Sequence, residues 1–310
     1  MKLIKFYFIT FLIIILNYDK LQAIENKILF KIDNEIITTF DIFQEAKYLK
    51  SFNPEVKDLS DRELLEISKN SIIRDKIKKI EILKFVKVVK VENQFLLKLI
   101  KSKYKALNID SIDNFESFLK ANDLDINTTR EKLAIELIWN DLIFQKFNSK
   151  ITIDRDKIKE EILKRPKKKE RELSLSEIFF SVSKKSDLNK KYETIMRDIE
   201  QTGFKNAALI HSNSDTASIG GYIGWVKEDN LNKAIKEKIS NLKIGQYSNP
   251  ILTSSGFLII KINDEKEFEV MSNINDKINE LIKFKTNEQL NQFSRIYFNK
   301  VKKDLIFDDL

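Results

Sequence analysis

The chain offers few side chains for nucleophilic, metal or redox chemistry. Its 310 residues include no cysteine and one histidine, His211. The lack of cysteine excludes disulfides, thiolate metal sites, a cysteine nucleophile and an N-terminal lipid anchor. A single histidine excludes a His-rich metal site and argues against a Ser–His–Asp relay. No G-x-x-x-x-G-K segment is present to hold nucleotide phosphates. We therefore expect no metal, no cofactor and no nucleotide.

The glycines instead mark one segment that could form a compact site. All six lie between 203 and 256, and glycine is typical of tight turns and close backbone approaches. The first motif, at 220–226, reads Gly-Gly-Tyr-Ile-Gly-Trp-Val. The second, at 244–260, reads Ile-Gly-Gln-Tyr-Ser-Asn-Pro-Ile-Leu-Thr-Ser-Ser-Gly-Phe-Leu-Ile-Ile. A strand pattern precedes them at 173–180, and helical spacing lies between them.

This ordered set of motifs resembles the parvulin family of peptidyl-prolyl isomerases, over about 172–263. The resemblance implies an FKBP-like α+β domain that catalyses cis-trans isomerisation of Xaa-Pro bonds. Such a catalyst binds the twisted amide better than the planar one. It needs an apolar slot for the proline ring and a small polar network beside the amide.

The resemblance places two family histidines and a Cys or Asp in the polar network. Here the histidine positions hold Glu177 and Leu258. The third position falls within 212–216, where Asn213, Ser214 or Asp215 could occupy it. The implied catalytic residues are thus Glu177, Asn213 and Asp215, in a degenerate network. His211 lies nearby, and we favour a surface or packing role for it over a catalytic one.

The implied proline slot is better retained than the network. It comprises Ile223, Leu231 and Ile235, with Ser255 and Leu258 beside it. The same aliphatic side chains are equally typical of plain core packing. With both histidines replaced, we expect weak or absent isomerase activity.

The first 23 residues have the parts of a secretory signal. Two lysines precede an apolar run from Phe6 to Leu16, and Leu-Gln-Ala ends at Ala23. The run is shorter than the roughly 20 residues of a membrane span, so we expect cleavage after Ala23 and no stable membrane anchor. The whole chain has a net charge of +8, which does not by itself require nucleic acid.

The rest of the chain has mainly helical patterns. A hairpin is predicted at 28–37 around Asp33-Asn34, followed by helices starting at Thr39 and after the Ser60/Glu63 capping box. Further helices are predicted near 92–106, from Ser111 and from Thr128. A long helix after 267 should pack on the N-terminal helices, and a strand near 304–307 should pair with the hairpin.

Three segments outside the glycine-rich region together resemble the SurA-type periplasmic chaperones. They are the signal, the hairpin segment Ile-Leu-Phe-Lys-Ile-Asp-Asn-Glu-Ile-Ile-Thr-Thr-Phe-Asp-Ile and the helical segment Ile-Trp-Asn-Asp-Leu-Ile-Phe-Gln-Lys-Phe. The fold class expected is α+β: a mainly helical domain, completed by a C-terminal helix, with an inserted parvulin domain. The expected boundaries are a signal peptide at 1–23, a helical domain at 24–165, a basic linker at 166–171, a parvulin-like domain at 172–265 and the C-terminal helix and strand at 266–310. The basic run could also bind anionic lipid or nucleic acid, but Pro166 and the following strand favour a solvated linker.

Three functions follow as hypotheses. The first is a periplasmic chaperone that binds unfolded outer-membrane or secreted chains, in an apolar groove between the helical domain and the parvulin module, with weak or lost isomerase activity. The second is an active prolyl isomerase in which Glu177 and Asp215 replace the usual network. The third is a membrane-tethered partner of the secretion machinery, with residues 6–18 uncleaved.

Overall fold

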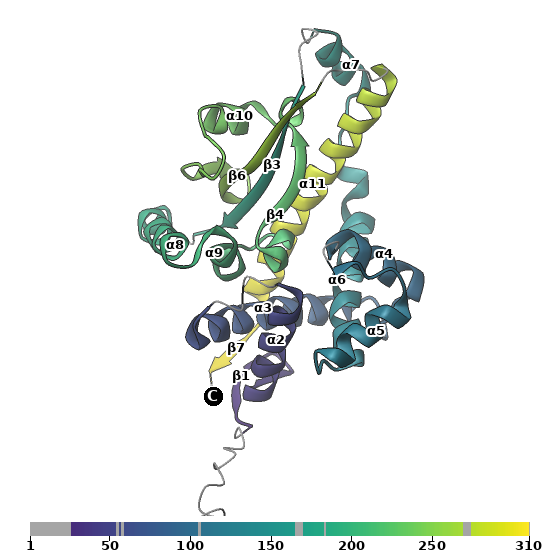
Figure 1. Ribbon diagram of the computed structural model, residues 1–310, viewed down its shortest axis with the longest axis vertical. Coiled ribbons are helices and arrows are strands. Elements are labelled where there is room, and N and C mark those ends of the chain that lie inside the picture. The colour runs from purple at the N-terminus through teal and green to yellow at the C-terminus, as the bar shows by residue number, and fades with distance from the viewer. Residues whose placement is uncertain are drawn as a thin grey trace, which may run out of the picture.

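The computed structural model describes residues 26–53, 56, 59–104, 107–164, 170–182, 184–268 and 274–309. The expected signal peptide lies outside them, as do residues 165–169 of the basic run. The described chain forms a lower helical part, an upper α+β module and a long C-terminal helix that runs along both (Figure 1). The expected fold class, α+β with a mainly helical chain and an inserted module, is confirmed.

A small sheet joins the two ends of the described chain. β1 (Ile28–Ile32) pairs with β2 (Glu35–Thr38) and with β7 (Phe307–Asp309), in the order β2-β1-β7. Asp33 makes the hairpin turn with a φ of +49°. The pairing of the C-terminal strand with the hairpin is confirmed, but the strand begins at Phe307 rather than near 304. The reason is that α11 extends through Asp304, and the Ile306 N–H then donates to the Asp33 carboxylate at 2.8 Å.

The N-terminal helices follow the sequence signals closely. Thr38 with Asp41 and Ser60 with Glu63 form reciprocal capping boxes that start α2 and α3, satisfying free backbone N–H groups at each helix end. Asp125 caps α6, so this helix begins slightly before the expected Thr128. The helices are α2 (Thr39–Phe52), α3 (Asp61–Ile82), α4 (Asn93–Lys103), α5 (Ile112–Ala121), α6 (Ile126–Phe147) and α7 (Arg155–Lys164).

The module is built on a four-stranded antiparallel sheet of order β4-β3-β6-β5. The strands are β3 (Glu170–Phe180), β4 (Tyr222–Lys227), β5 (Ile251–Thr253) and β6 (Gly256–Phe268). One sheet face, with Ile178 and Phe180, packs on α8 (Leu188–Thr202) and α9 (Phe204–His211). The opposite face, with Leu175 and Phe179, packs on α10 (Lys233–Ile239). Strand alternation thus sends successive β3 side chains into two separate cores.

The helix α11 (Ile274–Asp304) connects the module to the helical domain. It runs from α7 past the module sheet to the N-terminal helices (Figure 1). Its Tyr297 and Phe298 pack against the fully buried Trp139 of α6, with ring centroids 5.7 and 6.3 Å away. The expected completion of the helical domain by this helix is therefore confirmed. None of the described helices has the length and apolar content needed to cross a membrane.

Candidate functional site

Glu177 lies on the β3 strand where the glycine motif meets it. Its backbone N–H donates to the Gly221 carbonyl at 2.8 Å. Gly221 has a φ of +79°, and a Cβ there would lie 2.1 Å from the Glu177 carbonyl oxygen. Only glycine permits this approach. The Gly-Gly motif therefore brings the chain after α9 directly against Glu177.

Hydrogen bonds to β3 fix the position of the segment 212–216. The Phe179 N–H donates to the Ser212 hydroxyl at 3.0 Å, and the Asn213 N–H donates to the Phe179 carbonyl at 2.7 Å. The Thr216 hydroxyl then donates to Glu177 Oε1 at 3.0 Å, and the Ser214 hydroxyl lies 2.5 Å from that of Thr216. Ser214 and Thr216 thus form the polar network at Glu177.

Asp215 points away from Glu177, toward the helical domain. It begins the turn η5 (Asp215–Ile219), and its carboxylate lies 2.7 Å from Lys78 Nζ of α3. The Ser294 hydroxyl of α11 donates to the other carboxylate oxygen at 2.7 Å. Burial alone would raise the pKa of Asp215, but the Lys78 ammonium and these hydrogen bonds hold it below its usual value. Asn213 lines a separate 40 Å³ cavity together with Lys78. Neither Asn213 nor Asp215 has a described hydrogen bond to Glu177.

Arg295 of α11 completes the surroundings of Glu177. Its Nη1 lies 3.8 Å from Glu177 Oε2, and its guanidinium carbon lies 4.6 Å from the centre of the Phe179 ring. Such a stacked guanidinium is attracted both to the ring face and to the carboxylate. The Arg295 side chain is 13% exposed, and its Nε is buried without a hydrogen-bond partner.

A cavity of about 240 Å³ opens beside this network, between the module and the helical domain. Its wall includes a buried ion pair between Lys103 of α4 and Glu136 of α6. Burial opposes the charge on Lys103, but Glu136 overrides this and raises the pKa of the ammonium. The lining residues are Leu99, Ser102, Lys103, Glu136, Glu177, Ser214, Asp215, Thr216, Ile219, Asn291 and Arg295. An apolar groove was expected between the two parts; nine of the eleven residues that line this cavity carry polar or charged groups, but apolar atoms form most of its surface.

Most of the implied slot residues form one apolar cluster. Leu231, Ile235 and Leu258 pack together with Phe179, and Phe284 of α11 packs against the same cluster. Leu258 is 5% exposed. This position therefore contributes packing and presents no polar group.

Two of the implied substrate-binding residues lie apart from the cluster's members. Ile223 is 39% exposed on β4. Ser255 has a buried hydroxyl without a hydrogen-bond partner, next to Ser254, which contacts Gln292 of α11. The helix α11 therefore reaches the turn between β5 and β6 as well as Glu177.

His211 takes no part in this site. Its Nε2 lies 2.6 Å from Asp198 Oδ2 and its Nδ1 lies 3.2 Å from Lys191 Nζ, both on α8. Burial and Lys191 lower the pKa of the imidazole, in spite of the Asp198 carboxylate. The contacts of His211 are those of a residue that joins α9 to α8.

Sequence reasoning missed two members of the network, Thr216 and Arg295. Thr216 lies within the segment whose register the motif left open, so the resemblance could have found it. No sequence pattern pointed to Arg295, because a charged residue between Ser294 and Ile296 is typical of a solvated helix face.

Comparison with known proteins agrees with this architecture. A family model described as "Rotamase: PPIC-type PPIASE domain" matches residues 162–264. Two relatives named "Chaperone SurA" are 23% and 25% identical. The first, from Hahella chejuensis, matches over 165 residues, 50% of this chain and 38% of its own length. The second, from Pectobacterium atrosepticum, matches over 169 residues, 51% of this chain and 39% of its own length. The chain therefore spans about two fifths of the length of these relatives.

A solved structure from Campylobacter jejuni also matches. Its title describes the virulence factor PEB4 and the periplasmic protein Cj1289 as two structurally related SurA-like chaperones. It is 19% identical, with a TM-score of 0.37, and the match covers 92% of this chain and 99% of that one. The chain is therefore similar to a PPIC-type, or parvulin, domain over residues 162–264 and to proteins named "Chaperone SurA" over about half of its length.

Proposed function

We propose that the chain is an exported, periplasmic chaperone that binds unfolded outer-membrane or secreted polypeptides, and that its parvulin domain has weak or no isomerase activity. The observation that carries the proposal is the contact of Arg295 with Glu177 and Phe179. Through it, the C-terminal helix occupies the polar end of the implied isomerase site. The names of the curated relatives support the chaperone part.

The chemistry of prolyl isomerisation supports the low activity. The barrier to rotation is about 18–20 kcal/mol and comes from amide resonance. A catalyst lowers it with polar groups that act only on the twisted amide. Leu258 has no polar group to offer, and the Glu177 carboxylate is engaged by Thr216 and Arg295. What remains is an apolar cluster against which α11 also packs.

Export is proposed from the first 23 residues. A cationic start, a short apolar run and a small residue at the cut site fit a cleaved signal. The mature chain would then begin at Ile24 and carry no anchor. Mass spectrometry of the mature N-terminus tests this, and an intact Met1 on the exported protein would favour the membrane-tethered alternative.

The chaperone proposal is tested by dilution of an unfolded outer-membrane protein into buffer containing the mature chain. We expect light scattering to fall as the chaperone concentration rises, without nucleotide. In parallel, a protease-coupled assay on a Xaa-Pro peptide should give a rate at least ~100-fold below that of an active parvulin. Unchanged aggregation would overturn the chaperone function, and a rate equal to that of an active parvulin would overturn the claim of low activity.

The alternative, an active isomerase, is favoured by one observation. The Glu177 carboxylate and the Thr216 hydroxyl face a cavity of about 240 Å³. In that case turnover should be measurable and should fall in Leu231→Ala, because Leu231 belongs to the implied slot cluster. If Leu231→Ala leaves turnover unchanged, the activity does not depend on this slot.

A further inference from the structure

A further hollow lies within the helical domain, away from the implied parvulin site. It has a volume of about 410 Å³ and is lined by α2, α3, α6 and the residues just before α6. None of its lining residues belongs to the module or to α11. We call this hollow the α2–α3–α6 groove. It can therefore bind a ligand without displacing the Arg295–Glu177 contact.

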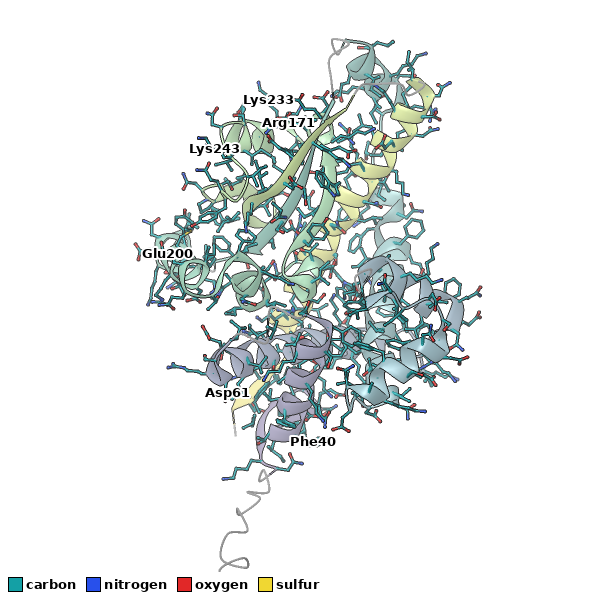
Figure 2. All side chains as sticks on the ribbon, viewed as in Figure 1. Phe40, Asp61, Arg171, Glu200, Lys233 and Lys243 are labelled. Carbon is teal, nitrogen blue, oxygen red and sulfur yellow. The ribbon has the colours of Figure 1, made fainter. Side chains whose placement is uncertain are left out.

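One side of the groove is apolar and includes an exposed aromatic side chain. Phe40 of α2 is 53% exposed and lies at the outer end of the helical domain (Figure 2). Outside the lining, Phe43, one helical turn further on, is 42% exposed, and Ile36 of β2 is 46% exposed. Ile72 contributes a buried apolar surface to the lining. Adjacent large apolar side chains left in water indicate a binding surface.

The groove has the opposite charge to the rest of the chain. Its lining contains five carboxylates and three ammonium groups, a net charge of −2, whereas the whole chain carries +8. Most of the rim groups already have partners. Asp41 and Asp125 cap the starts of α2 and α6, and Lys79 pairs with Glu131 at 2.7 Å. With Lys76 counted, the rim contributes a net charge of −1, and the floor residues Glu45, Asp75 and Lys132 contribute the other −1.

On the floor, one ammonium group is shared by two carboxylates. Lys132 Nζ lies 2.9 and 3.0 Å from the two oxygens of Glu45, and it also pairs with Asp75. The same ammonium lies 4.9 Å from the centre of the Tyr48 ring. Arg74, which lines the adjoining 40 Å³ cavity, is a second cation close to the Asp75 and Glu45 carboxylates. A further cation entering the groove would therefore be attracted by the net charge of −2 of the whole lining rather than by the floor alone.

We propose that the α2–α3–α6 groove binds an extended client segment in which a Lys or Arg stands close to an aromatic or large aliphatic side chain. The cation lies among the rim and floor carboxylates of the lining, and the apolar side chain packs on Phe40. This inference rests on the proposed chaperone function and names a client-binding site and its specificity.

The test uses the mature chain and three fluorescein-labelled peptides of one Phe- and Tyr-rich sequence. Their single variable position is Arg, Gln or Glu, and binding is followed by fluorescence anisotropy. We expect the Arg peptide to bind about fivefold more tightly than the Gln peptide, and the Glu peptide to bind most weakly. This difference should largely vanish in about 0.5 M NaCl, because salt screens charges at a groove open to water.

Two variants separate the charge from the apolar surface. Asp75→Asn halves the net charge of the lining and should reduce the preference for Arg, while Phe40→Ser should weaken all three peptides and keep the preference. Glu131→Gln, at the rim, should reduce the preference and serves if Asp75→Asn does not fold. Glu200→Gln makes the same change in charge on the exposed surface of α8, and it should bind like the wild type.

The outcomes distinguish this inference from the proposed function. If the chain suppresses aggregation but binds the three peptides equally, or if Phe40→Ser binds as well as the wild type, the groove is not the client site. If the chain neither suppresses aggregation nor binds any peptide, the chaperone function itself fails. If Phe40→Ser instead abolishes a concentration-dependent dimer in sedimentation, the groove holds a second copy of this chain, and the inference is overturned.

Discussion

Glu177 stands where the resemblance places a histidine, and this difference has a physical consequence for the rest of the site. A carboxylate buried in a protein is costly unless a hydrogen bond or a cation stabilises it. Here Thr216 provides the hydrogen bond and Arg295 provides the cation. The replacement of the histidine and the contact with the C-terminal helix are therefore two parts of one arrangement. It stabilises the packing of the module against α11.

The stability of this arrangement can be measured with a double-mutant cycle. Arg295→Ala should lower the free energy of unfolding by about 3 kcal/mol, because it leaves the Glu177 carboxylate buried without its cation. Adding Glu177→Gln should restore part of this loss, because a neutral amide can still accept the Thr216 hydrogen bond. Urea denaturation of the four proteins gives the coupling energy.

Arg295→Lys is the matched control for that cycle. It keeps the positive charge but loses the planar guanidinium that stacks on Phe179. The free energy of unfolding of Arg295→Lys should fall between those of the wild type and Arg295→Ala. Additive effects of Arg295→Ala and Glu177→Gln would mean that the two side chains do not interact.

At the scale of elements, local signals predicted most of the secondary structure. Capping residues such as Ser60 and the Asp33-Asn34 turn act on their own neighbours, so the sequence alone was enough to find them. The long-range contacts were different. Asp215 was expected beside Glu177, but its partners Lys78 and Ser294 lie 137 and 79 residues away in the chain. No local pattern specifies which distant helix faces a short turn.

The docking of η5 on α3 and α11 should therefore depend on pH. The pKa of Asp215 is lowered in the folded chain, so its stabilising contribution is present above its ordinary value of 3.8 and is lost as the pH falls through the lower folded value. Asp215→Asn should lose about 2 kcal/mol of stability at pH 7, because Lys78 is left without its carboxylate. Urea denaturation from pH 7 down to pH 3 should show that the difference in free energy of unfolding between the wild type and Asp215→Asn becomes smaller below about pH 4.

The matched control for this pH dependence is Asp123→Asn. The Asp123 side chain is 90% exposed and pairs with Lys47 on the surface. Removal of a surface pair changes stability very little at any pH. If the difference in free energy of unfolding between the wild type and Asp215→Asn stays constant down to pH 3, the role given to the Asp215 charge is contradicted.

At the scale of the whole molecule, several polar contacts tie the module to the helical framework. Lys78 bonds Asp215, Arg295 pairs with Glu177, and the Ser294 hydroxyl donates to Asp215. Arg74 of α3 also donates to the Leu209 carbonyl of α9. The resemblance predicted that a C-terminal helix completes the helical domain. It could not predict that the same helix lies against Glu177, because that contact depends on side chains outside the shared motifs.

These ties predict that the mature chain unfolds as one cooperative unit. Domains joined by small, polar interfaces generally move and unfold separately, whereas here buried ionic contacts and α11 connect the two parts. Calorimetry should therefore give one transition, with equal calorimetric and van't Hoff enthalpies.

Asp215→Ala combined with Arg295→Ala should split this transition into two, because both remaining partners, Lys78 and Glu177, would then disfavour the docked state. Lys233→Ala, which removes an exposed pair with Glu237 on α10, should leave one transition. Two transitions in the wild type would mean that the module and the helical domain are energetically independent, and that α11 binds the module too weakly to restrain it.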